Sequence, residues 1–336
     1  MTAATAVARL EKPSSLWSDA WRRLRRNRSA IAGGSMLAVL TLVAVFAPAL
    51  ATHNPIEPLI GIENVKKRAA PCIHLRGCPA DQPQHLFGTD GNVRDLFSRV
   101  LYGARLSLVI GVTTVTFAIL VGTALGLLAG YVGGWADVVI MRFMDVLLAF
   151  PSLLLAIAIV TVLGPGLINA LLAIGVVSIP IYARVIRAGV LSTKEMDFVT
   201  ASRALGASPI RLMIGRILPN ALTPLVVQGT LGIATAILDA AALSFLGLGA
   251  QHPTPEWGLM VGQEYKNIFN APHLTFFPGF ALILTVLSFN LLGDGLRDAL
   301  DPRLGSTTLP REVRAAQPGR ARPKGTSRGT RRWYAR

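Results

Sequence analysis

Few side chains of this 336-residue sequence could do chemistry, and four of them lie close together in one polar stretch. They are Cys72, His74, Cys78 and His85. The two cysteines are the only ones in the chain, and in an oxidising compartment we expect them to form a disulfide that closes a small loop. Free thiols are one alternative. The other is a metal site of all four side chains, although their spacing matches no familiar metal-binding pattern.

A fifth side chain is notable because it is an acid inside a long apolar run. Asp239 interrupts the stretch 222–245, which is otherwise apolar enough to lie in a membrane. An intramembrane carboxylate suggests a functional site, here a contact on the path of a transported solute. The alternative is a structural hydrogen bond that packs this helix against a neighbour.

Catalytic machinery is missing from the sequence. No Gly-Lys dipeptide occurs anywhere, so the chain lacks a phosphate-binding loop of the pattern G-x-x-x-x-G-K-[ST]. The apolar runs also hold no set of serine, histidine and aspartate and no histidine cluster. We therefore expect this chain not to be an enzyme and to carry no cofactor of its own.

The elements that must position these residues are membrane-spanning helices. Hydrophobic residues make up 52% of the chain and charged residues 15%, against roughly 25% charged in a typical soluble domain. The apolar runs predict an all-α polytopic membrane protein with six spans. These are expected at 31–50, 106–129, 138–162, 167–186, 222–245 and 276–292. A proline inside the third span, Pro151, predicts a kink there.

The basic residues indicate how the chain is oriented. The net charge is +15, and residues 1–30 hold seven Arg and Lys residues while residues 301–336 hold ten. Basic flanks mark the cytoplasmic side, so both termini are expected there, and the near absence of aromatic residues in the tails argues against nucleic acid. We predict an interfacial helix within 1–30 and a disordered tail over 301–336. Residues 51–101 are then an extracytoplasmic insertion, and 102–300 form a core of five spans.

A polar, basic segment interrupts the apolar pattern between the fourth and fifth spans. Residues 195–219 are predicted to form two short helices on either side of Gly206, with Ser208 capping the second and Pro209 at its first position. The apolar residues of each helix are expected to share one face. They are Phe198, Ala201 and Leu205 in the first helix and Ile210, Met213, Ile214 and Ile217 in the second. Such faces need a cover, and a separate protein is the natural candidate.

This segment resembles the coupling segment of ABC importer permeases, an E-A-A-x-x-x-G loop that docks on the ATP-hydrolysing subunit. Here the pattern is T-A-S-R-A-L-G, with Thr200 in place of the glutamate and Ser202 in place of the second alanine. The role of the missing carboxylate is therefore not carried over. The resemblance implies that the docking residues are Thr200, Ala201, Ser202, Leu205, Gly206, Ile210 and Met213.

Three other stretches resemble the peptide and nickel branch of the same permeases. They are the G-T-D…R-D…S-R…Y-G-A-R run over 88–105, in which Val93 replaces a usual glycine, the run 243–258 and the ending over 290–303. The resemblance implies the permease subunit of an importer in a bacterial inner membrane. Its cargo would be di- or oligopeptides, or alternatively nickel, haem or another solute.

The resemblance also implies partners. These are a second permease subunit, ATPase subunits that carry ATP and Mg²⁺, and an extracytoplasmic substrate-binding protein. The competing hypothesis is a secondary transporter or channel driven by an ion gradient. That class usually carries several intramembrane ionisable groups, whereas only Asp239 lies deep in a span here.

Overall fold

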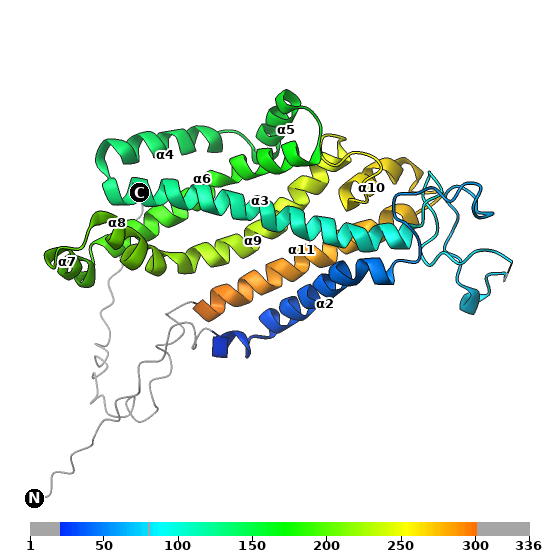
Figure 1. The fold of residues 1–336 in the computed structure, drawn as a ribbon, viewed down its shortest axis with the longest axis horizontal. Helices are drawn as coiled ribbons and strands as arrows, with labels where there is room; N and C mark the ends of the chain where they lie inside the picture. Colours follow the sequence, from blue (N-terminus) through cyan, green and yellow to red (C-terminus); the bar gives the residue numbers. More distant parts are fainter. Residues whose placement is uncertain (1–20, 80, 301–336) are drawn as a thin grey trace, which may run out of the picture. The chain divides into compact units, whose positions relative to one another are not determined.

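The computed structural model describes residues 21–79 and 81–300, and within them the regular structure is helical. The long helices are α2 (Arg28–Leu50), α3 (Leu96–Val132), α6 (Leu167–Lys194), α9 (Leu218–Phe245) and α11 (His273–Leu300) (Figure 1). The shorter ones are α4 (Gly134–Leu148), α5 (Ser152–Leu163), α7 (Asp197–Ala204), α8 (Pro209–Leu212) and α10 (Trp257–Glu264). Single turns occur at η1 (His74–Arg76), η2 (Met213–Ile217, π-helical) and η3 (Tyr265–Asn267).

Five of these helical stretches are long and apolar enough to cross a membrane, and α8 to α9 counts as one of them. A sixth is obtained if α4 and α5, which are bent by 92° relative to one another, form one broken span. The predicted all-α polytopic class is thus confirmed. The third span, however, is not a single kinked helix. Helix α4 ends before Pro151 because proline disfavours the helical conformation in the preceding residue and lacks an N–H of its own.

Close packing of α3 along α6 forms the centre of the bundle, and α9 contacts both helices. Gly122, Gly126 and Gly130 recur every four residues on α3 and face α6. A Cβ atom added at Gly126 would lie 2.3 Å from the carbonyl oxygen of Ala183. The two backbones therefore approach as closely as glycine allows, as the small-residue spacing predicts. Helix α11 packs between α2 and α9 (Figure 1).

Two ion pairs connect α4 to α6, and one of them differs from the pairing that the sequence predicts. The spacing of Arg142 and Asp145 predicts a pair within one helix. In the structure Asp145 instead accepts a hydrogen bond from Arg184 of α6. Asp137, near the start of α4, binds the Arg187 guanidinium through both carboxylate oxygens. The partners lie on the neighbouring helix because the turn after α3 folds α4 back against α6.

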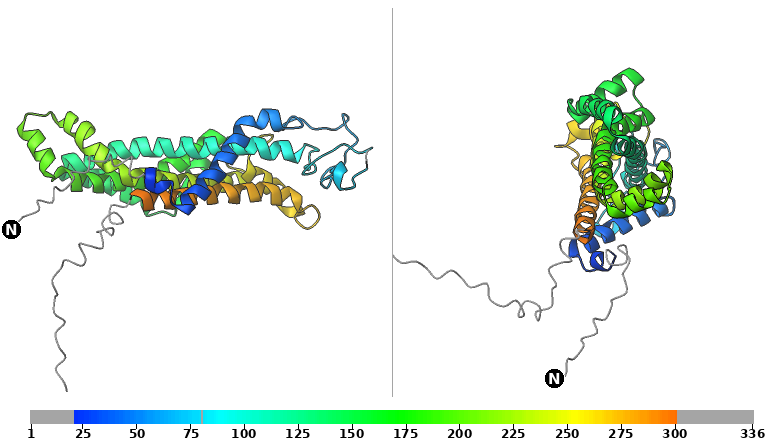
Figure 2. Two further views of the ribbon diagram at one scale, coloured as in Figure 1. Left: turned by 90° about the horizontal axis from the view of Figure 1, so that it is seen from below. Right: turned by 90° about the vertical axis from the view of Figure 1, so that its left-hand side faces the viewer.

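The insertion between α2 and α3 lies at one end of the bundle, and α7 and α8 lie at the opposite end (Figures 1 and 2). We call these the insertion end and the coupling end. At the insertion end Trp257 of α10 is buried, and its indole N–H donates to the Val100 carbonyl at 3.0 Å. A tryptophan in a loop predicts an interfacial anchor, but this one packs the loop after α9 onto the start of α3.

The predicted interfacial helix falls mostly outside the described residues. Residues 21–24 are helical, and the Arg25 guanidinium lies 4.8 Å from the centre of the exposed Trp21 ring. Residues 1–20 and the basic tail 301–336 lie outside the described part of the chain, so the rest of the interfacial helix and the disordered tail stay predictions.

Candidate functional site

The coupling end is built around a sharp reversal of the chain at Gly206. Helix α7 ends at Ala204, and Gly206 adopts φ of +83°. The Gly206 N–H donates to the Arg203 carbonyl and the Ala207 N–H to the Ser202 carbonyl. This pair of bonds is a Schellman motif, which requires a left-handed residue where Gly206 stands. No atom lies within 4 Å of a Cβ added there, so the backbone conformation, rather than crowding, is what selects glycine.

Exposed apolar side chains surround this reversal. Leu205 is 88% exposed, Ile210 is 70% exposed and Ile214 is 59% exposed. Thr200 and Ala201 are also exposed, and Ser202 is half-buried. Val199 on the opposite side of α7 is fully buried against the bundle. The segment therefore has one side packed on the transmembrane core and an apolar side without cover among the described residues.

The second helix of the coupling segment differs from the prediction in two ways. It is not a separate short helix, because the π-helical turn η2 joins α8 directly to α9. Its inner side consequently packs on the bundle, so Ile217 is buried and Met213 is half-buried, and these residues do not share the exposed face of Ile210. Pro209 occupies the first helical position as predicted, but the Ser208 side chain makes no capping hydrogen bond.

At the insertion end the structure joins Cys72 and Cys78 in a disulfide, with the two Cα atoms 5.4 Å apart. The alternative metal site of Cys72, His74, Cys78 and His85 is therefore not formed. The His74 Nε2 atom instead lies 2.8 Å from the Gln82 carbonyl oxygen. His85 exchanges two backbone hydrogen bonds with Cys72, which aligns the disulfide loop against it.

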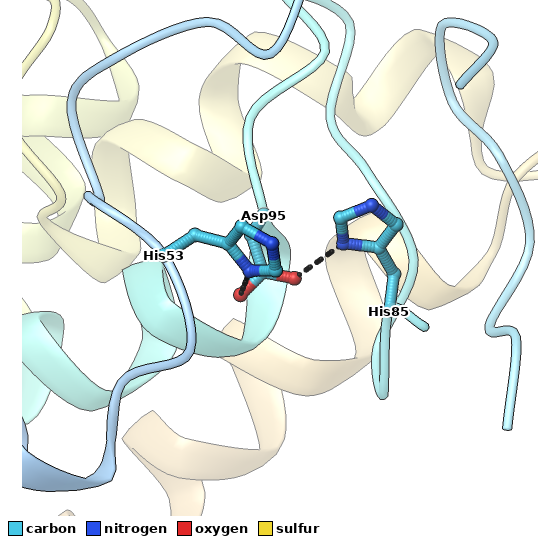
Figure 3. A group of neighbouring side chains, drawn as sticks. All are labelled: His53, His85 and Asp95. Atoms are coloured by element: carbon cyan, nitrogen blue, oxygen red, sulfur yellow. Dashed lines mark hydrogen bonds and ion pairs between the residues drawn. The ribbon is translucent and has the colours of Figure 1, made fainter. Parts of the chain in front are cut away.

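The His85 side chain points away from the disulfide into a cluster of other polar groups. Its Nδ1 lies 2.9 Å from Asp95 Oδ1 and its Nε2 lies 3.0 Å from Glu63 Oε2. The His53 Nε2 atom lies 3.1 Å from Glu63 Oε1. Figure 3 shows the two imidazole rings on either side of the Asp95 carboxylate. The sequence does not single out His53, Glu63 and Asp95, because they come from separate segments that only the fold brings together.

The cluster shifts the acidity of its buried members. Burial alone would lower the pKa of His85, but hydrogen bonds and charges of Asp95 and Glu63 outweigh burial, so its pKa is raised. Burial would likewise raise the pKa of Asp95, but hydrogen bonds from His85 and Ser98 outweigh it, so its pKa is lowered. Asp95 is also the N-cap of α3, accepting from the Ser98 backbone N–H at 2.8 Å. The cluster thus places two carboxylates and two imidazole rings at the point where the insertion enters the bundle.

Two buried arginines fasten the loops of the insertion end together. Arg94 Nε donates to Asp90 Oδ2 at 2.7 Å. Arg99 donates to the carbonyl oxygens of Pro55 and Pro253 at 2.7 and 3.1 Å. Both side chains are about 1% exposed. A charged run next to a span is usually solvated, so nothing in the sequence predicts that these guanidinium groups form the core of this end.

Asp239 lies in α9 and is half-buried, with no hydrogen-bond or ion-pair partner among the described residues. It lies six residues before the end of α9 at Phe245, on the side of the loop that leads to α10. Whether it contacts a solute or packs a helix stays a prediction.

Comparison with known proteins agrees with this architecture. Residues 122–306 match the family described as binding-protein-dependent transport system inner membrane component, and residues 15–71 match the N-terminal TM domain of oligopeptide transport permease C. The dipeptide transport system permease protein DppC of Alkalihalophilus pseudofirmus is 49% identical over 86% of this chain and 91% of its own length.

Further relatives agree. The di/tripeptide permease DppC of Pseudomonas aeruginosa is 47% identical over 87% of this chain and 93% of its own. The glutathione permease GsiD of Escherichia coli is 45% identical over 86% of this chain and 91% of its own length. A solved inward-facing structure of the MetNI methionine ABC transporter matches 61% of this chain and 98% of its own chain, with 21% sequence identity and a TM-score of 0.50. The matched part of this chain therefore shares the fold of that structure. This chain therefore belongs to the family of binding-protein-dependent transport system inner membrane components.

Proposed function

We propose that the chain is the permease subunit of an ATP-driven importer that translocates di- or oligopeptides. The observation that carries the cargo class is the nature of the relatives, which are named for dipeptides, di/tripeptides and glutathione. All three are short peptides, and this favours peptides over nickel or haem. Family membership also favours an ATP-driven importer over a gradient-driven carrier.

The coupling end supplies the contact with the ATPase under this proposal. ATP and Mg²⁺ bind to separate ATPase subunits, since this chain has no phosphate-binding loop. The predicted docking residues that remain exposed or half-buried on the outer side are Thr200, Ala201, Ser202, Leu205, Gly206 and Ile210, whereas Met213 packs partly against the bundle. The exposed side chains of Leu205 and Ile210 are the anchors, because burying each of them contributes most in apolar area.

The source of energy gives the direct test of this function. Uptake of a labelled dipeptide into cells or vesicles is expected to stop when ATP is depleted and to continue when ionophores collapse the ion gradients. The tagged transporter, purified with its partners, should also hydrolyse ATP. Uptake that survives ATP depletion but is abolished by ionophores would instead support the secondary-transporter hypothesis.

Selectivity is proposed to lie mainly in the extracytoplasmic binding protein. A peptide brings two charged termini, and holding them in a low-dielectric path requires counter-charges or many fixed dipoles. Within the spans predicted from hydropathy, Asp239 is the one acid that does not lie near a cytoplasmic end, and conduction in any case favours weak binding. The insertion 51–101 and loop 246–275 are proposed to receive the binding protein, and a second permease subunit to complete the path.

A binding measurement tests this assignment of selectivity. The purified membrane subunits without the binding protein are expected to bind labelled dipeptide more weakly than about 1 mM. Asp239→Asn should then change the uptake rate only slightly. Tight, competable binding that Asp239→Asn abolishes would contradict the proposal and would make Asp239 the leading ligand of the path.

The proposal also fixes an orientation in a bacterial inner membrane. The coupling end and both termini face the cytoplasm, and the insertion end faces outside, where a disulfide is stable. A cysteine placed in either tail should be protected from an impermeant reagent added outside intact cells. External labelling of either tail would reverse or reject the orientation.

A further inference from the structure

The cluster of His53, Glu63, His85 and Asp95 has an unusual arrangement of donors and acceptors. One carboxylate, Glu63, receives the Nε2 atoms of both imidazole rings, at 3.1 Å from His53 and 3.0 Å from His85. An ionised carboxylate only accepts hydrogen bonds. Both rings must therefore carry their proton on Nε2, and in the neutral rings each Nδ1 atom is left with a lone pair.

Both of these Nδ1 atoms face a second carboxylate, that of Asp95. His85 Nδ1 lies 2.9 Å from Oδ1, and His53 Nδ1 lies 3.9 Å from Oδ2 (Figure 3). The Thr52 hydroxyl lies 2.9 Å from His53 Nδ1 but can donate its proton to Asp95 Oδ2 at 3.3 Å instead, which leaves the His53 lone pair available. His85 Nδ1 has no hydroxyl neighbour among the described residues. A lone pair and a carboxylate oxygen at 2.9 Å repel one another unless a positive charge lies between them. The geometry therefore calls for a cation at Asp95.

The number of charges favours a divalent ion over protons. A single proton on His85 Nδ1 leaves the cluster with two carboxylates and one positive charge. A second proton on His53 would create two imidazolium rings whose centres are 5.0 Å apart. Because the side chains of His85 and Asp95 are 2% and 0% exposed, solvent screens either imbalance poorly. One divalent cation neutralises both carboxylates without protonating either ring.

The same atoms match the preferences of a transition metal. In a tetrahedral zinc site each ligand atom lies about 2.1 Å from the ion, so the ligand atoms lie about 3.4 Å from one another. The nearest ligand atoms of His53, His85 and Asp95 already lie within 4.8 Å of one another. Glu63 has the position usual for a carboxylate that orients metal-binding histidines, since it accepts the N–H on the far side of each ring.

We propose that His53, His85 and Asp95 bind a divalent transition-metal ion, best matched by Zn²⁺, through their Nδ1, Nδ1 and carboxylate oxygen atoms. Glu63 orients both imidazoles, and water fills the fourth position. The ion enters from the side of His53 and Glu63, whose side chains are 20% and 22% exposed. It ties the end of α2, the middle of the insertion and the first turn of α3 to one point, so the metal would fix the shape of the insertion.

Zinc binding to the purified full-length chain tests this directly. The protein carries an affinity tag without histidine, is stripped with a chelator, is equilibrated with Zn²⁺ alone and is then assayed by calorimetry and elemental analysis. We expect one tightly held zinc per chain. Co²⁺ in the same site should give the visible absorption bands of a tetrahedral complex.

Matched variants locate the ion. His53→Ala should weaken zinc binding by at least about a hundredfold, and Glu63→Gln by about ten- to a hundredfold, since it removes only an orienting contact. His74→Ala, in the same insertion but bonded to Gln82, should bind zinc as the wild type does. The His53 and Glu63 side chains are partly exposed, so variants at these two positions should fold. A melting curve for each variant checks this. Wild-type protein that retains no more zinc than His53→Ala would overturn the proposal and leave a proton as the cation.

Discussion

Gly206→Val is expected to abolish uptake while the protein still inserts and folds in the membrane. The substituted residue cannot adopt φ of +83° without strain, because a β-branched side chain is highly unfavourable in the left-handed region. Such strain costs about 1–3 kcal/mol. Unwinding the Schellman turn that joins α7 to α8 relieves this strain at the lowest free-energy cost. That change moves Leu205 away from Ile210 and so disrupts the surface proposed to dock on the ATPase.

The comparison with Gly206→Asn separates two reasons for the loss. Asparagine tolerates the left-handed conformation far better than valine does. If only the backbone shape matters, Gly206→Asn should retain most uptake. If the ATPase must also approach the backbone closely, Gly206→Asn should fail as well, since its side chain projects into the space that is open in the chain alone. The measurements are ATP-dependent uptake and co-purification of the ATPase subunits.

Gly215→Val is the matched control for these variants. Gly215 lies in the neighbouring turn η2, is exposed, does not have a left-handed backbone and would place its Cβ in open space. It should keep more uptake than Gly206→Val does. Normal uptake by Gly206→Val would show that the coupling segment has been assigned to the wrong part of the chain.

The membrane spans could be predicted from the sequence because the physics is local. Twenty consecutive apolar residues are sufficient to span the bilayer, whatever surrounds them. The helices are nonetheless longer than the predicted spans, since α3 begins at Leu96 and α6 continues to Lys194. Polar turns extend a helix beyond its apolar core whenever their backbone bonds can continue, and hydropathy does not report this.

The features that could not be predicted depend on contacts between distant segments. His53 and Asp95 are 42 positions apart and meet only because the insertion folds back on α3. Likewise, Asp145 has a basic neighbour one turn away in sequence, yet its partner is Arg184 on another helix. A local pattern predicts which groups are charged, but the packing of helices decides which of them meet.

The glycines between α3 and α6 give the largest expected effect on folding. Gly126→Ala should strongly destabilise the chain, because the new Cβ would lie 2.3 Å from the Ala183 carbonyl oxygen. Overpacking of a tight interface typically costs about 1–3 kcal/mol and occasionally more, and here the obstacle is backbone, which cannot rotate away. The measurement is the fraction of monodisperse protein that remains in detergent after heating. Gly279→Ala on α11, whose Cβ would meet no neighbour, is the control and should leave that fraction unchanged.

A second position in the same interface shows whether backbone contact is the cause. Gly175 on α6 faces the ring of Phe117 on α3, with its added Cβ 2.6 Å from a ring carbon. Gly175→Ala should therefore destabilise the chain as well, but adding Phe117→Ala should recover much of the loss, since the obstacle is then a removable side chain. Adding Ala183→Gly to Gly126→Ala should recover little, because the carbonyl oxygen remains. Equal rescue at the two positions would show that α3 and α6 are held apart by side chains and do not touch through their backbones.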